Sequence, residues 1–444
     1  PVFYASSTLN IGVAQIMDVV TELLPSPAII GSTLAIDPKT KEPVERVISS
    51  KGPYAAYVFK TIADPFAGRI SLIKLYSGTM RSDTVYNNQT KGKSEKLGPL
   101  QIIQGKSMVP IGEVHAGDFF AVTKLKETTT GDTLCDPAHP ILFSSVTIPE
   151  PSITLAIEPK SRGDEDKISN ALARITEEDG AIKYTRDAQT KQLLLSGSDQ
   201  LHVEVTVSKL RKRYGVEVIL KTPKIPYRET IRGKADVQGR HKKQTGGHGQ
   251  FGDCWIKIEP LERGGKFEFV DEIFGGAIPR NFIPAVEKGI VEAAARGYLA
   301  GYPVVDFRVI LYDGSYHSVD SSEMAFKIAG SLAFKKAMES ANPVLLEPIM
   351  NVEIYAPQEY AGALTGDLTS RRGRLQGMDI KRDIQTIKAQ VPMAEMVSYS
   401  PVLTSVTGGR GTYHMEFSHY DEVPAHIVQK IIEEANKGRT QEEE

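Results

Sequence analysis

The chain has 444 residues, of which 41% are hydrophobic and 24% are charged, and its formal net charge is −2. At roughly 150 residues per domain, this length predicts about three domains and more than one hydrophobic core. The near-neutral charge excludes a globally basic nucleic-acid binder but not local basic patches, the two cysteines exclude a disulfide framework, and the absence of a run of about 18 apolar residues predicts no membrane span.

The N-terminal residues carry two elements that cannot form a core alone. Residues 1–5 are predicted to form a short strand, and apolar residues spaced three and four apart predict a helix over residues 11–24. Asn10 is the expected N-cap of this helix, and Pro25 ends it. Because these elements must pack on a larger body, and because the chain starts at Pro1 rather than Met, we expect it to be a fragment.

Residues 28–148 are predicted to form a small β-barrel. Glycine and asparagine residues that favour turns separate five short predicted strands, at residues 54–59, 68–76, 84–87, 113–116 and 119–122. Several short strands at regular spacing are typical of such barrels.

Two later segments share the element order β-α-β-β-α-β, which is that of the ferredoxin-like fold. In residues 149–226 the predicted elements are strands at 153–157, 193–196 and 216–220, one further strand inferred from the plan, and helices at 164–180 and 202–214. In residues 347–444 they are strands at 348–355, 377–381, 385–390 and 412–417 and helices at 357–368, 395–405 and 423–435.

Between these two segments, residues 227–346 are predicted to form an α+β unit. Its predicted elements are strands at 251–259, 265–271 and 304–312 and helices at 281–296 and 320–339. The predicted fold class is therefore multidomain α+β, in which a β-barrel is followed by two ferredoxin-like α/β sandwiches that flank this α+β domain.

A glycine-rich loop leads into the first predicted strand of that unit. Gln244-Thr245-Gly246-Gly247-His248-Gly249-Gln250 follows a stretch that contains five cations, Arg232, Lys234, Arg240, Lys242 and Lys243. Exposed backbone N–H groups beside cations suit a phosphate backbone. A hairpin loop with solvated lysines explains the same residues equally well, so both interpretations stay open at this point.

A second loop, residues 314–323, places serine, histidine and aspartate close together. A hydrolase that uses His317 and Asp320 is a disfavoured alternative, because triad members are normally distant in sequence and no GxSxG elbow is present. Asp320 with Glu323 three residues later instead predicts a capping box at a helix start. Tyr316 and His317 precede that cap, where they can stack on bases and donate to phosphate or 2′-OH groups.

The remaining motifs predict no catalytic residue, no metal site and no nucleotide-phosphate site. No HExxH or CxxC spacing is present, and Gly92-Lys93-Ser94 and Gly105-Lys106-Ser107 lack the first glycine of a Walker A loop. Two further basic clusters could contact RNA phosphate or mark solvated surfaces, one at residues 209–213 and one that contains Arg371 and Arg372.

The chain contains a series of long motifs in the same order as in the bacterial elongation factor G family of translational GTPases. It resembles that family from the end of the nucleotide-binding G domain onward. The motifs are residues 64–69, 131–134, 243–252, 275–279, 315–323, 345–348, 371–373 and 415–420. The resemblance implies a G-domain stub (residues 1–27), domain II (28–148), domain III (149–226), an elongated domain IV that enters the decoding site (227–346) and domain V with a tail (347–444).

The same resemblance implies partners and roles. It implies a cytoplasmic, monomeric protein that binds the ribosome, through rRNA and ribosomal proteins, and the tRNA–mRNA duplex, as part of a factor that couples GTP hydrolysis to translocation. GTP and magnesium are expected for the full-length parent and not for this chain. Ser6 and Ser7 align with a guanine-contacting motif, and the implied RNA contacts are Lys243, Gln244, Thr245, Gly246, Gly247, His248, Gly249, Gln250, Tyr316, His317, Arg371 and Arg372.

Some residues depart from the family pattern. His248 stands where arginine is common, Ser318 where aspartate is usual, and residues 197–202 and 397–401 also differ. These departures resemble those of a divergent elongation factor G-like paralogue. They leave two alternatives open, a factor specialised for ribosome recycling and one that protects the ribosome from an antibiotic.

Overall fold

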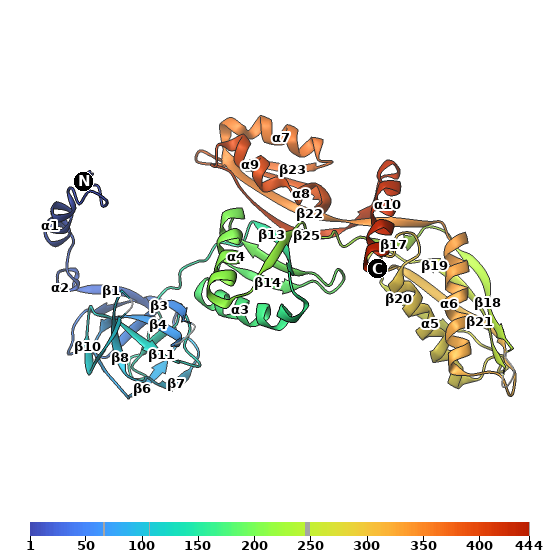
Figure 1. Cartoon of the computed structure of the whole chain (residues 1–444), viewed down its shortest axis with the longest axis horizontal. Coiled ribbons are helices and arrows are strands. Elements are labelled where there is room, and N and C mark those ends of the chain that lie inside the picture. The colour runs from blue at the N-terminus through green and yellow to red at the C-terminus, as the bar shows by residue number, and fades with distance from the viewer. Residues whose placement is uncertain (65–66, 106, 245–248, 444) are drawn as a thin grey trace. The chain divides into compact units, whose positions relative to one another are not determined.

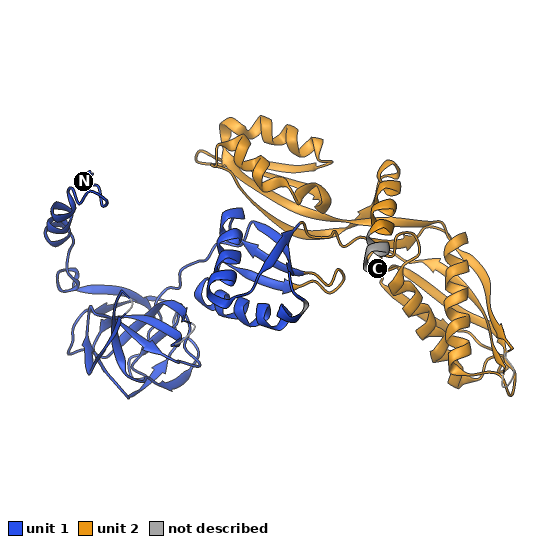
Figure 2. Ribbon diagram, in the orientation of Figure 1, with its two compact units in different colours: residues 1–185, 193–221 blue, residues 186–192, 222–444 orange. Residues whose placement is uncertain are grey.

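The computed structural model describes residues 1–64, 67–105, 107–244 and 249–443 (Figure 1). The chain divides into two compact units (Figure 2): the first holds residues 1–185 and 193–221, and the second holds residues 186–192 and 222–444. Helices and several separate β-sheets occur along the chain, which is therefore a multidomain α+β protein.

The first unit begins with two short helices, α1 (Val13–Leu23) and α2 (Pro27–Ile30), which contain no buried residue. The stretch Val13–Ile30 has a mean hydropathy of 1.3, so by length and composition alone it could cross a membrane, which differs from the expectation of no span. It is the one such stretch in the described part of the chain. The break between α1 and α2 makes it weak evidence for a span.

Two local predictions for this segment are wrong. Residues 1–5 form no strand, and the backbone beside them makes a single bridge between Ser6 and Ile11. Asn10 is not the N-cap of α1, because Gly12 takes that position with a φ of 75°. Glycine adopts this left-handed conformation without steric strain, so the chain turns into the helix two residues later than predicted.

Among its described residues, the β-rich part of the first unit contains twelve strands: β1 (Ser32–Ile36), β2 (Pro43–Val47), β3 (Ala55–Asp64), β4 (Gly68–Ser77), β5 (Thr79–Arg81), β6 (Val85–Asn88), β7 (Lys93–Lys96), β8 (Leu100–Gln104), β9 (Ser107–Ile111), β10 (Glu113–His115), β11 (Phe119–Thr123) and β12 (Thr133–Cys135). Eight of them form a sheet in the order β7-β6-β12-β3-β4-β11-β8-β9, and β1-β2 and β5-β10 form ribbons. The five predicted strands are present. Others escaped prediction because edge strands such as β7 are mostly polar and exposed.

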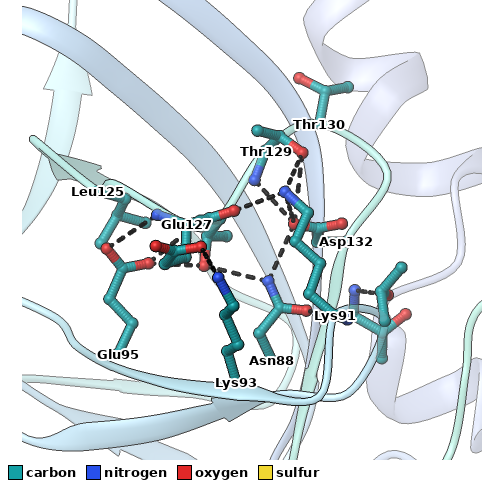
Figure 3. Close-up of polar contacts among 12 residues, drawn as sticks. Asn88, Lys91, Lys93, Glu95, Leu125, Glu127, Thr129, Thr130 and Asp132 are labelled. Atoms are coloured by element: carbon teal, nitrogen blue, oxygen red, sulfur yellow. Dashed lines mark hydrogen bonds and ion pairs between the residues drawn. The ribbon is translucent and has the colours of Figure 1, made fainter.

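A polar network in this part of the chain involves two of the sequence motifs, residues 131–134 and Gly92-Lys93-Ser94 (Figure 3). The buried carboxylate of Asp132 accepts a hydrogen bond from the side chain of Asn88 (2.9 Å) and pairs with the ammonium of Lys91 (3.1 Å). Lys93 pairs with Glu127 at 2.7 Å, and this hydrogen bond lowers the pKa of the Glu127 carboxyl. The lysine of Gly92-Lys93-Ser94 therefore lies at the start of β7 and pairs with a carboxylate of the same unit.

The rest of the first unit is a four-stranded sheet with two helices. Its elements are β13 (Ile153–Pro159), α3 (Glu165–Glu178), β14 (Lys183–Arg186), β15 (Leu193–Gly197), α4 (Gln200–Tyr214) and β16 (Val218–Lys221), with the strand order β14-β15-β13-β16. The predicted apolar face of α3 is confirmed, because Ile168, Leu172 and Ile175 are buried in the core. Gly215 ends α4 in the left-handed conformation, also as predicted.

The first part of the second unit is a four-stranded sheet and two helices. It contains β18 (Ala235–Lys243), β19 (Gln250–Pro260), β20 (Phe267–Asp271), α5 (Ile283–Arg296), β21 (Phe307–Ser315) and α6 (Glu323–Ser340), with the strand order β18-β19-β21-β20. The helices lie directly against each other. A Cβ on Gly289 of α5 would lie 2.0 Å from the carbonyl oxygen of Lys327, and one on Gly330 of α6 would lie 2.5 Å from that of Val286.

The other part of the second unit is built around one long strand, β22 (Pro343–Pro357). Its other elements are β17 (Arg228–Ile231), α7 (Ala361–Ser370), β23 (Arg374–Lys381), β24 (Ile384–Pro392), α8 (Met393–Met396), α9 (Tyr399–Thr407), β25 (Thr412–Glu422) and α10 (Ala425–Glu443). The strand order is β17-β22-β24-β23, and β25 also pairs with β22. The first residues of β22 pair with β17, and residues from Ile349 onward pair with β24.

A buried carboxylate ties β17 to the loop that follows α5. Glu229 is fully buried, and its two carboxylate oxygens accept hydrogen bonds of 2.6 to 3.1 Å from five consecutive backbone N–H groups, those of Tyr298, Leu299, Ala300, Gly301 and Tyr302. The loop of residues 298–302 therefore folds around the Glu229 carboxylate, which satisfies backbone N–H donors inside the protein.

Candidate nucleic-acid interface

The glycine-rich loop closes the hairpin formed by β18 and β19. The last residue pair of this antiparallel ladder is Lys243 with Gln250, and the loop joins them. Gln244 and Gly249 are described, whereas the candidate residues Thr245, Gly246, Gly247 and His248 lie outside the described residues. The strand β18 was not predicted, because its exposed positions carry Arg240, Lys242 and Lys243 and so mask the alternation typical of strands.

Two glycines in the hairpin allow it to lie against α6. A Cβ on Gly239 would lie 2.2 Å from the carbonyl oxygen of Ala329, and a Cβ on Gly252 would lie 2.5 Å from that of Ala325. Only residues without a side chain fit at these distances, so the hairpin backbone packs directly on the helix. The hairpin end is thereby held beside the start of α6, where the second candidate loop lies.

The second loop enters α6 differently from the sequence prediction. The N-cap is Ser322, whose hydroxyl accepts the N–H of Ala325 at 3.2 Å, so the capping box of Asp320 and Glu323 is wrong. The carboxylate of Asp320 instead accepts the N–H of Gly249 at 3.0 Å. The helix starts later because the chain first runs extended beside the hairpin, where Ser321 forms a parallel bridge with Phe251.

Backbone hydrogen bonds join the two loops. The N–H of Phe251 donates to the carbonyl oxygen of Asp320 at 2.8 Å, and the hydroxyl of Ser321 donates to the carbonyl oxygen of Phe251 at 3.0 Å. Candidate residues that are more than 60 positions apart in the sequence, Gln250 and His317, are thus brought to one end of the second unit.

Hydrogen bonds to the ring of His317 indicate which of its two nitrogens carries the proton. Its Nδ1 faces the backbone N–H groups of Val319 (3.3 Å) and Asp320 (3.2 Å), which assigns the ring proton to Nε2. An Asp320 carboxylate oxygen also lies 3.4 Å from Nδ1, but an ion pair there would need a proton on the atom that accepts these bonds. His317 and Tyr316 are both about half exposed. An imidazole donor beside an aromatic face is suited to unpaired RNA bases and phosphates.

The cations beside the loop are Arg240, Lys242 and Lys243, all exposed. The guanidinium of Arg240 lies over the ring of Phe251 at 5.5 Å, and no ion pair of Lys242 or Lys243 occurs among the residues that the structure describes. The other two predicted cations are engaged within the protein: Lys234 pairs with Glu259, and Arg232 with Glu422. Of these five cations, the three that form no ion pair among the described residues therefore lie beside the hairpin loop.

The structure does not place Arg371 and Arg372 with these loops. The guanidinium of Arg372 binds the buried carboxylate of Glu347 through two nitrogens (2.6 and 3.0 Å) and that of Glu395 through a third (3.0 Å). Arg371 pairs with Asp367 at 2.9 Å and lies over the ring of Tyr399. Both side chains stabilise the sheet and helices around β22, and an RNA contact by either would compete with these ion pairs.

The candidate residues Ser6 and Ser7 lie near the N-terminus, apart from these loops in the sequence. The hydroxyl of Ser6 accepts the N–H of Leu9 at 3.4 Å, and Ser7 is exposed. Elsewhere in the described residues, no group of three or more His, Cys, Asp or Glu side chains is arranged to hold a metal ion. Both cysteines are buried and free, and burial raises the pKa of the Cys254 thiol to about 12.

Models of four protein families match consecutive parts of the chain. They are described as elongation factor G domain 2 (residues 53–137), elongation factor G domain III (residues 148–222), elongation factor G domain IV (residues 223–342) and elongation factor G C-terminus (residues 344–431). The hairpin loop and the His317 loop both lie within the domain IV match.

Two relatives cover nearly the whole chain. This chain is 47% identical over 441 residues to elongation factor G of Aquifex pyrophilus. The match covers 99% of this chain and 63% of the relative. A crystal structure of a protein from Thermus thermophilus matches with a TM-score of 0.75 and 40% identity, over 98% of this chain and 62% of that one. The chain thus spans somewhat less than two thirds of the length of these relatives.

Proposed function

Because the chain belongs to the elongation factor G family, we propose that it is the ribosome-binding part of a translation factor that moves tRNA and mRNA through the ribosome. In this proposal the β-rich part (residues 28–148) is a barrel, and residues 149–226 and 347–444 are ferredoxin-like. Residues 227–346 form the arm that enters the decoding site. Ser6 and Ser7, in the segment 1–27, would belong to a G domain that binds GTP and magnesium in the longer, cytoplasmic parent.

The observation that carries this proposal is the arrangement at the hairpin end. Tyr316 and His317, both about half exposed, lie on one loop. The exposed Lys242 and Lys243 lie at the end of β18, in the hairpin that hydrogen bonds join to that loop. Such groups bind RNA through phosphates, 2′-OH groups and base faces, without covalent chemistry. We therefore assign them to the tRNA–mRNA duplex and the surrounding rRNA, and Gln244, Gly249 and Gln250 to the same surface.

Binding to ribosomes is expected to weaken steeply as salt is raised, because each phosphate neutralised by a cation releases counterions. Pelleting of the chain with ribosomes across a salt series measures the slope. The variant Lys242→Gln/Lys243→Gln should flatten the slope of log K against log salt by about 1 to 2. A matched variant in the first unit, Lys39→Gln/Lys41→Gln, should leave it nearly unchanged. Salt-independent binding, or equal slopes for the two variants, would contradict the assigned phosphate contacts.

In a full-length factor that contains this chain, His317→Ala is expected to slow translocation by about 10- to 100-fold, which corresponds to the loss of about 1 to 3 kcal/mol of base or phosphate contact. GTP hydrolysis should persist, because His317 would contact RNA and not nucleotide. His426→Ala removes another exposed histidine and should have no effect on either rate. Rapid-mixing measurements of the translocation rate and of the GTP hydrolysis rate test this expectation. Unchanged translocation in His317→Ala would count against the proposal.

A further inference from the structure

We propose that Asp320 is a positioning residue that locks the re-entry of the hairpin into β19, at Gly249 to Phe251, to the His317 loop, so that Gly249, Gln250 and His317 are held in a fixed arrangement. Its contacts with Gly249, Phe251 and His317 carry this inference. The lock itself is a property of the fold, and only its consequence for RNA binding depends on the proposed function.

Three different groups of Asp320 bind the two loops. Its carboxylate accepts the N–H of Gly249 (3.0 Å), its carbonyl oxygen accepts the N–H of Phe251 (2.8 Å), and its own N–H donates to Nδ1 of His317 (3.2 Å). The first two bonds fix the point where the hairpin loop re-enters β19. The third bond orients the imidazole of His317, whose side chain is about half exposed. One residue therefore sets the position of both candidate RNA-contacting elements.

Gly249 lies directly against this carboxylate. A Cβ built on Gly249 would lie 2.9 Å from both Cγ and Oδ2 of Asp320, closer than a real Cβ contact. A side chain at position 249 would therefore displace the Asp320 carboxylate that accepts the Gly249 N–H, 71 residues further along the chain.

A carboxylate at a surface that binds phosphate would normally oppose binding. The Asp320 side chain is directed to the Gly249 N–H within the protein and is less than one third exposed. It does not act as the helix cap, because Ser322 fills that role. The contacts that remain for Asp320 are those that join the loops, which explains why an acidic side chain is compatible with this end of the unit.

A double-mutant cycle on the full chain tests the lock directly. Gly249→Ala alone should raise the exchange rate of the Phe251 amide with solvent deuterium by tenfold or more, because the new methyl group displaces the Asp320 carboxylate. In an Asp320→Ala background, the same substitution should change that rate by less than twofold. Two effects that simply multiply would overturn the proposal.

Two further variants separate positioning from general loss of structure. Asp320→Asn keeps an oxygen that can accept the Gly249 N–H, so it should retain most of the protection that Asp320→Ala loses. Ser322→Ala removes the α6 cap, and its effect should multiply with that of Gly249→Ala because the two do not touch. Equal losses in Asp320→Asn and Asp320→Ala, or coupling between Ser322→Ala and Gly249→Ala, would contradict the assigned role.

Ribosome experiments on the same variants distinguish the lock from the function. If the cycle shows coupling and Asp320→Ala also slows translocation in the full-length factor, while Asp320→Asn keeps translocation near its normal rate, both inferences are supported. If the cycle shows coupling but translocation is unaffected by either Asp320→Ala or His317→Ala, the lock stands and the RNA-contacting function of these loops fails. If the cycle shows no coupling, the lock is wrong whatever the translocation rates are.

Discussion

Glu229→Ala is expected to lower the stability of the second unit by about 3 kcal/mol or more. The substitution removes the acceptor of five backbone N–H groups, those of residues 298–302, in a place that water does not reach freely. Removing one partner of a buried charged network is among the few single changes with effects of this size. Glu229→Gln should be intermediate, because one amide oxygen can still accept while its NH₂ group meets other donors.

Hydrogen exchange in the native state is the appropriate measurement, because a chain with several domains does not unfold as one unit. The amides of Tyr298 to Tyr302 should lose protection in Glu229→Ala by a factor of roughly 100 or more, as 1.4 kcal/mol corresponds to tenfold. Glu262→Ala removes an exposed carboxylate of the same unit and should change stability by about 0.5 kcal/mol or less. Equal protection in the two variants would show that the loop holds itself without the Glu229 carboxylate.

Gly289→Ala is expected to destabilise the second unit by about 3 kcal/mol, although alanine is normally the better helix former. The added Cβ would lie 2.0 Å from the carbonyl oxygen of Lys327 and 2.9 Å from its carbonyl carbon. Backbone atoms cannot rotate away, so α5 and α6 must separate. Separation would loosen the core that Val286 and Ile290 share with Phe326.

The matched control, Gly366→Ala, is expected to change the free energy of unfolding in the opposite direction. Gly366 also lies inside a helix, α7, but a Cβ there would meet nothing within 4 Å. Gly366→Ala should therefore stabilise its helix by about 0.5 to 1 kcal/mol, through propensity alone. Urea titration followed by hydrogen exchange of the α6 amides compares the two variants. A neutral effect of Gly289→Ala would mean that the helices can move apart without loss of packing.

Local sequence patterns correctly predicted the elements whose tertiary contacts agree with their local preference. Ile168, Leu172 and Ile175 are buried as their spacing indicates, and Gly215 ends its helix as a glycine at that position should. The resemblance to a known family, based on ordered motifs, is also correct at the level of the family.

Contacts between distant segments account for the failures. Asp320 was expected to cap α6 because Asp-x-x-Glu is a local pattern, but its carboxylate binds Gly249, whose proximity no local pattern reveals. Distant contacts also decide the surroundings of Arg371 and Arg372, whose assignment to RNA stays a prediction. Their cluster of positive charge is visible in the sequence, whereas the carboxylates that neutralise it come from α7, from β22 and from the segment after β24.

The strand β22 has a mechanical consequence for the second unit. Its fifteen residues pair with β17 at one end and with β24 at the other, and β25 runs along most of it. Bending at the middle would break ladder hydrogen bonds worth about 0.5 to 1.5 kcal/mol each, and the bulge between Ile349 and Met350 fixes the local twist. Torque applied to the end that carries α7 and α9 is therefore transmitted to β17 as rotation, rather than absorbed as bending.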